Sequence, residues 1–174
     1  MSRYLSRVLV ADEKLLYSAQ LHWVVFLRGL GMTLFGVLVG QVGLHVIEVL
    51  LGAEIAKQLA SNVTKASVII ILVGAYDLLR AYIKQISTEL VITNRRVIAK
   101  YGFIATTTFE LMMNKVEGAN IDQTVAGRIL GYGTILVKGT GGGISPIDHV
   151  AEPYRFHAAL MQILDRIQKR NLHD

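Results

Sequence analysis

The chain has 174 residues, of which 52% are hydrophobic and 18% are charged, and its formal net charge is +5. Such an apolar composition excludes a disordered chain, a coiled coil and a nucleic-acid-binding tail, and it disfavours a wholly soluble single domain. The chain has no cysteine, which excludes disulfides, thiolate metal sites and cysteine nucleophiles. In so apolar a chain, the positive charge indicates membrane lipids rather than nucleic acid as the partner.

Two apolar segments predict a transmembrane hairpin over residues 23–86, after an N-terminal segment of residues 1–22. The first span, residues 29–47, is free of formal charge between Arg28 and Glu48. At about 1.5 Å per residue it covers about 28 Å, close to the hydrocarbon thickness of about 30 Å. The second span covers residues 66–83. A secretory signal peptide fits poorly because the first run is too long and starts too late, whereas a buried hairpin in a soluble protein stays open.

The connection between the spans, residues 48–65, is predicted to lie outside the membrane. Leu51, Ile55 and Leu59 recur every four residues, so we expect the first helix to continue beyond the membrane, or to lie on its outer face, until Ser61-Asn62 ends it. Basic residues are enriched before the first span and after the second, while the connection is neutral. This asymmetry predicts that both termini are cytoplasmic.

Small and charged residues within the spans suggest how the hairpin is held. Gly36, Gly40 and Gly43 share one face of the first span, which packs either on the second span or on another copy in a homo-oligomer. Asp77 and Arg80 are three positions apart and are expected to pair as an interfacial anchor. The alternative is that these charges mark an ion path.

From residue 87 onward the pattern becomes that of short strands. Alternating residues around Thr93-Asn94 predict a β-hairpin, and further strands are expected at 115–122, 133–140 and 144–150. The last predicted element is a helix that begins at Pro153 and carries an apolar stripe. Its members are Phe156, Leu160, Ile163, Leu164 and Ile167. The fold class is thus a membrane helical hairpin plus a small all-β barrel or sandwich, residues 87–174, closed by a C-terminal helix.

Several stretches carry a family resemblance. They are the hairpin TNRRVIAKYGFI, the segment KVEGANIDQTVAGRILGYGTILVKGTGG and the segment ISPIDHVAEPYRFHAAL. Together with the N-terminal EKLLYSAQLHW, they resemble the bacterial membrane-anchored family of pleckstrin-homology-like (PH-like) proteins. The resemblance implies a cytoplasmic PH-like module tethered to the inner membrane, and it brings no catalytic residues.

No constellation of catalytic or metal-binding residues is found. The glycine cluster Gly139–Gly143 lacks the residues of a dinucleotide or Walker loop, and it indicates a hairpin connection more than an anion loop. The histidines show no metal spacing, and His45 with Glu48 is one pair rather than a site. We therefore expect no enzyme, no cofactor and no metal.

The basic residues Arg95, Arg96 and Lys100 lie around the first hairpin, where the PH resemblance implies contacts with lipid phosphates. They would serve general attraction to anionic lipid, a head-group pocket or a protein contact. The leading hypothesis is a non-enzymatic adaptor or scaffold that presents its β domain at the cytoplasmic face, for a membrane or cytoplasmic protein or for self-assembly. The alternatives are anionic head-group binding through the first hairpin and an oligomeric transport or channel subunit.

Overall fold

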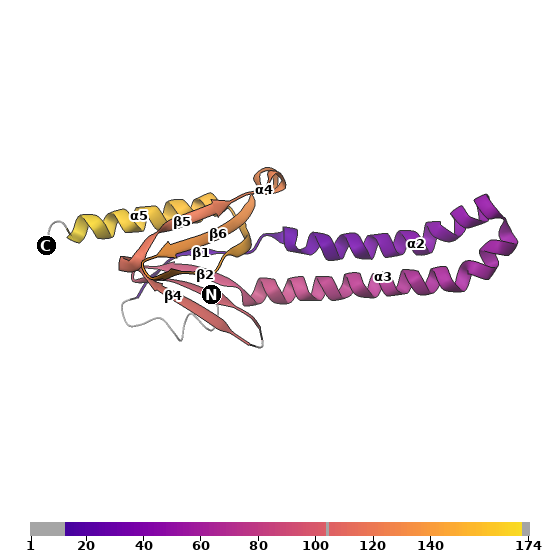
Figure 1. Ribbon diagram of the computed structural model, residues 1–174, viewed down its shortest axis with the longest axis horizontal. Helices are drawn as coiled ribbons and strands as arrows, with labels where there is room; N and C mark the ends of the chain where they lie inside the picture. Colours follow the sequence, from indigo (N-terminus) through magenta and orange to yellow (C-terminus); the bar gives the residue numbers. More distant parts are fainter. Residues whose placement is uncertain (1–12, 104, 172–174) are drawn as a thin grey trace. The chain divides into compact units, whose positions relative to one another are not determined.

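The computed structural model describes residues 13–103 and 105–171. The chain divides into two compact units (Figure 1). One is helical and comprises Trp23–Lys84, and the other is built from the chain on either side of it. The helical unit is therefore an insertion within the second unit, which we call the β unit.

The helical unit starts with a short 3-10 helix, η1 (Trp23–Phe26), and continues as α2 (Leu27–Leu51) and α3 (Ala53–Ser87). Gly52 separates the two long helices: its φ is +91°, and its N–H donates to the carbonyl of Glu48 at 2.9 Å. Glycine takes this conformation without steric cost. The expectation that the first helix runs on to Ser61-Asn62 is wrong. Both residues lie inside α3, because Ser and Asn only weakly oppose a helix that tertiary packing supports.

Both long helices could cross a membrane by length and composition. Few of their most apolar residues are buried within the protein, unlike the core helix of a soluble domain. At about 1.5 Å per residue, the 25 residues of α2 span about 37 Å and the 35 residues of α3 about 52 Å. The expected spans 29–47 and 66–83 fall within α2 and α3, and the remaining length includes the charged residues near Gly52.

Sheet A of the β unit has the strand order β1-β2-β3-β4, with every neighbouring pair antiparallel. Its strands are β1 (Leu15–Ala19), β2 (Glu89–Thr93), β3 (Arg96–Tyr101) and β4 (Thr107–Met112). The predicted hairpin is confirmed in β2 and β3. Strand β1 was not predicted, because the sequence analysis set residues 1–22 apart from the β domain. Both chain connections to the helical unit, after His22 and after Lys84, leave the same end of sheet A, where Ala19 pairs with Leu90. We call this the junction end.

Sheet B is formed by the following part of the chain, in which β6 is central and pairs with β5, β7 and β8. Its strands are β5 (Val116–Asp122), β6 (Tyr132–Gly139), β7 (Gly142–Gly143) and β8 (Ile147–Ala151). The predicted strands are confirmed to within a few residues. A 3-10 turn, η2 (Met113–Lys115), precedes β5. A short helix, α4 (Val125–Leu130), connects β5 to β6 and was not predicted.

The helix α5 (Pro153–Asn171) runs alongside β5 (Figure 1), and its buried side chains complete the core of the β unit. Phe156 and Leu160 are fully buried, and Leu164 and Ile167 pack against the same core. This confirms the predicted apolar stripe and the fold class. Within the described residues the two sheets form a sandwich and do not close into a barrel.

Candidate functional site

The first basic residue of interest, Arg96, is held by carboxylates. Its Nη2 lies 2.8 Å from Oε2 of Glu13 and its Nε lies 3.0 Å from Oε1, a two-point contact, while Nη1 lies 2.7 Å from Oε2 of Glu110. The Glu13 side chain is fully buried and that of Arg96 is 12% exposed. The hydrogen bonds that Arg96 donates to Glu13 raise the pKa of Arg96 above its ordinary value, although burial opposes this shift. Arg96 therefore serves the fold by joining the segment before β1 to β3 and β4.

The hydroxyl of Thr93 completes this network. It accepts hydrogen bonds from the backbone N–H groups of Arg95, at 3.2 Å, and Arg96, at 3.0 Å, which fixes the turn between β2 and β3. It also lies 2.8 Å from Oε1 of Glu13, to which it can donate. The conspicuous Thr93-Asn94-Arg95-Arg96 motif thus has a structural explanation.

The three predicted head-group residues do not converge on one site. Arg95 is exposed in the turn, at the end of sheet A opposite to the junction end. Lys100 pairs with Glu89 and lies toward the junction end. Their separation of five positions in sequence corresponds to about 16 Å of strand. With Arg96 engaged by Glu13 and Glu110, these side chains do not form one phosphate pocket.

The glycine face of α2 lies against α3 of the same chain. A Cβ added to Gly36 would come within 2.7 Å of Ile71, and one added to Gly40 within 2.5 Å of the Ser67 hydroxyl. That hydroxyl donates to the carbonyl of Gly36 at 2.8 Å. Gly43 is looser, with Val63 at 3.6 Å. The contacts step along both helices by three or four residues, so a second copy of the chain would need another face.

The expected pairing of Asp77 with Arg80 is wrong. Asp77 instead lies 3.1 Å from Nε of Arg28, on the facing helix α2, and the guanidinium of Arg80 sits 5.7 Å from the ring centre of Tyr76. Asp77 is on the side of α3 that faces α2, where its side chain is 15% exposed. The acidic residue thus links the two helices rather than two turns of one helix.

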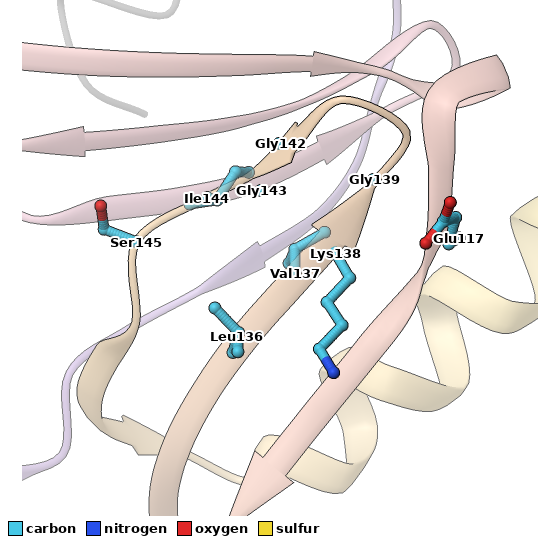
Figure 2. A pocket seen from close by; sticks show the side chains of 9 residues that line it. All are labelled: Glu117, Leu136, Val137, Lys138, Gly139, Gly142, Gly143, Ile144 and Ser145. Atoms are coloured by element: carbon cyan, nitrogen blue, oxygen red, sulfur yellow. The ribbon is translucent and has the colours of Figure 1, made fainter.

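The glycine cluster forms the hairpin between β6 and β7, as predicted. A hollow of about 390 Å³ lies beside it, and Figure 2 shows the Lys138 and Glu117 side chains on neighbouring strands at its wall. An anion there would meet the Glu117 carboxylate as well as the Lys138 ammonium. The hollow therefore gives no support to an anion loop. Among the described residues no group of His, Asp and Glu is arranged to hold a metal ion.

Sequence reasoning missed a groove between β5 and α5. It has a volume of about 370 Å³ and is open to solvent. Side chains from η2, β5 and α5 line it, four of them apolar and three polar: Met113, Val116, Leu164 and Ile167, then Asn114, Glu117 and Gln168. Strand β5 is an edge strand of sheet B, pairing with β6 and with no other described strand. The apolar stripe of α5 was a signal for this groove, but it was interpreted only as part of a helix that closes the β domain.

Two packed antiparallel sheets and a C-terminal helix that fills the core define a protein of the pleckstrin-homology class. The model of the bacterial PH domain family matches residues 27–171, so the chain belongs to that family. The match includes both long helices and the part of the β unit that follows them, and it begins after β1. A comparison with curated proteins gave no match, and neither did one with solved structures.

Proposed function

We propose that this chain is a non-enzymatic membrane adaptor, whose β unit binds an extended segment of a partner protein in the groove between β5 and α5. The observation that carries the proposal is an edge strand beside an open apolar groove. An edge strand offers backbone N–H and C=O groups to an added strand, and an adjacent groove receives alternate side chains of that strand. Figure 1 shows α5 lying along β5, so both features serve one peptide.

The groove also suggests the chemistry of the bound segment. Leu164, Ile167 and Val116 favour an apolar side chain, because its burial removes apolar surface from water. The exposed carboxylate of Glu117 at the groove wall favours a basic side chain next to it. The proposed ligand is therefore an extended segment that combines apolar residues with Lys or Arg.

Site-specific cross-linking of the full chain in its own membrane tests this proposal. A photoreactive amino acid at Gln168, in the groove, should yield an adduct with a partner. The same amino acid at Arg166, exposed on α5 outside the groove, should yield none. Glu117→Lys should abolish the adduct, while Asp122→Lys, further along β5 and outside the groove, should preserve it. Equal adducts at both positions, or an adduct that survives Glu117→Lys, would contradict the proposal.

The proposal places the protein in the bacterial inner membrane with both termini in the cytoplasm. Its support is the basic flanks of the hairpin and the fact that both helices connect to one β unit, which requires both connections to lie on one side. Single cysteines are clean probes because the native chain has none. A cysteine at Ser61 should be labelled from outside intact cells and one at Thr140 should not. The reverse labelling would invert the topology.

Head-group binding through the first hairpin is a weaker proposal, since Arg96 is engaged by two carboxylates and Arg95 and Lys100 are apart. A transport role has little support as well. The one acidic residue predicted within a span, Asp77, lies against Arg28 on the facing helix. Self-assembly stays a prediction, and it would use a face other than Gly36, Gly40 and Gly43.

A further inference from the structure

Helix α4 exposes apolar side chains to an unusual degree. Val125 is 80% exposed and Ile129 is 78% exposed, more than any large apolar residue of α2 or α3 with a described side chain. The two are four positions apart and therefore share one face of the helix. Leu130 and Arg128 are also exposed on α4. A soluble surface rarely gathers such residues without a partner for them.

The helix that carries these exposed apolar side chains is capped at both ends and packed closely on one side. Thr124 caps the N-terminus, with its hydroxyl accepting from the N–H of Gly127 at 3.0 Å, and Gly131 ends the helix at a φ of +81°. Gln123 donates to the carbonyls of Gly127 and Tyr132. A Cβ on Gly127 would come within 2.6 Å of the Tyr132 carbonyl, so only glycine permits this close packing. The buried side of α4 is thus fixed, and Val125 and Ile129 are held outward.

Helix α4 is also tied to the segment that leads into the helical unit. The ring of Tyr132, two residues after α4, contacts the rings of both His22 and His149, with centroids 5.5 Å and 5.7 Å away. The N–H of His22 donates to the carbonyl of His149 at 2.7 Å, and the N–H of Glu152 donates to that of Gly131 at 2.9 Å. The residue after His22 is Trp23, with which the helical unit begins. These contacts lie within the β unit and link the residues that follow α4 to His22, the last residue before the helical unit.

These observations favour a bilayer as the occupant of this face. A six-residue helix with three exposed apolar side chains is small for a specific protein interface, which buries about 800 Å² on each partner. A lipid interface needs no shape complementarity. It accepts apolar side chains at the boundary of head groups and acyl chains, and it attracts cations to its phosphates. Trp23, half-exposed at the start of the helical unit, is a residue type enriched at that same boundary.

We propose that α4 is a membrane-surface contact, in which Val125 and Ile129 enter the lipid interface and Arg128 pairs with lipid phosphates. The two long helices of the proposed membrane hairpin already keep the β unit at the bilayer. The contact through α4 would therefore set how the β unit is oriented there rather than whether it is bound. The proposal assigns membrane contact to the connection between β5 and β6, and not to the basic residues of the first hairpin.

Fluorescence quenching of the full chain in lipid nanodiscs tests the proposal. An environment-sensitive dye is attached to a cysteine at Ile129, or to one at Thr140 as a control. Thr140 is exposed in the connection between β6 and β7, at the opposite end of β6 from α4. The discs contain phosphatidylcholine and phosphatidylglycerol, with or without a lipid carrying a nitroxide near its head group. The dye at 129 should lose most of its fluorescence to the nitroxide lipid and be shielded from aqueous iodide. The dye at 140 should show the reverse.

Variants in the Ile129→Cys background separate the contributions of Val125 and Arg128 to the membrane contact. Val125→Asp should restore iodide access and reduce lipid quenching, whereas Val125→Leu should leave both unchanged. Arg128→Gln should reduce lipid quenching in discs with phosphatidylglycerol more than in discs of phosphatidylcholine alone. A dye at 129 that iodide quenches and the nitroxide lipid does not would overturn the proposal. So would a dye shielded from both, since that result would indicate a protein on this face.

Discussion

The helical unit and the β unit differ in how far apart in sequence their internal contacts are. In the helical unit, α2 and α3 follow each other in the chain, and small residues such as Gly36 and Ser67 let their backbones approach. In the β unit, strand β1 pairs with β2 across the whole inserted hairpin, with Leu15 opposite Thr93. The helical unit is thus contiguous in sequence, whereas the β unit closes only when two distant segments meet. The two long helices are therefore an insertion within the β unit and not a separate segment in front of it.

Leu160→Asp should have the largest effect, and it should separate the units. Leu160 is fully buried in the core of the β unit. Truncating a buried leucine costs about 2–5 kcal/mol, and a buried charge adds to that. Because small domains are stable by about 5–15 kcal/mol, we expect the β unit to unfold while the hairpin still inserts. Rapid proteolysis of the β unit, with full retention of the chain in the membrane fraction, is the expected result. A protease-resistant β unit would show that α5 is not part of the core.

Removing Glu13 should have the next largest effect, and it tests whether the segment before β1 belongs to the β unit. Glu13→Ala removes the carboxylate to which Arg96 donates two hydrogen bonds, in a place where the Arg96 side chain is 12% exposed. Breaking a buried ion pair typically costs about 3–5 kcal/mol. The variant with both Glu13→Met and Arg96→Met should be less destabilised than Glu13→Ala, because no buried charge is left behind. Pulse proteolysis in urea measures the difference in stability. An unchanged urea midpoint for Glu13→Ala would show that Glu13 does not contribute to the stability of the β unit.

Local patterns predicted most of the architecture. The alternation on both sides of Thr93-Asn94 identified β2 and β3, and the stripe containing Phe156 and Leu160 identified α5. These signals are local because they depend on the period of one element. The pairing of β1 has no such signal, since its partner follows an insertion of two long helices. The same reason explains Arg96, which reads as a surface cation until Glu13, 83 positions away, is placed beside it.

The short helix α4 and the groove show a second limit of sequence reasoning. Thr124 and Gly131 are good capping residues, but six residues between them are too few for a helical period to appear. The groove consists of residues from η2, β5 and α5, and its apolar members have the same residue types as the core. Only the packing of α5 beside an edge strand distinguishes the two roles.

A smaller effect, confined to the helical unit, is expected for Gly36→Leu. The new side chain would clash with the Ile71 backbone and side chain, and overpacking of this kind costs about 1–3 kcal/mol. Gly31→Leu is the matched control, because a Cβ there has no neighbour within 4 Å. Disulfide formation between cysteines at Gly43 and Val63 reports the pairing of α2 and α3. It should fall in Gly36→Leu and not in Gly31→Leu, and the β unit should keep its protease resistance in both. Equal cross-linking in the two variants would contradict this glycine packing.

The smallest effect concerns the pH dependence of the β unit alone. Burial raises the pKa of Tyr101 from 10.0 to about 12, and its hydroxyl donates to the carbonyl of Ser145 at 2.7 Å. A raised folded-state pKa means that folding favours the neutral phenol. The stability that this provides is complete below pH 10 and is lost as the pH rises toward about 12. Tyr101→Phe lacks the ionisable group. Between pH 9.5 and 11.5, a window chosen to bracket the unfolded-state pKa of 10.0, its unfolding midpoint in urea should therefore fall less than that of the parent protein. The packing of α2 against α3, followed by the cysteine pair at Gly43 and Val63, should be the same in both proteins. If the parent and Tyr101→Phe lose stability in parallel, the Tyr101 hydroxyl ionises as readily in the folded β unit as in the unfolded chain.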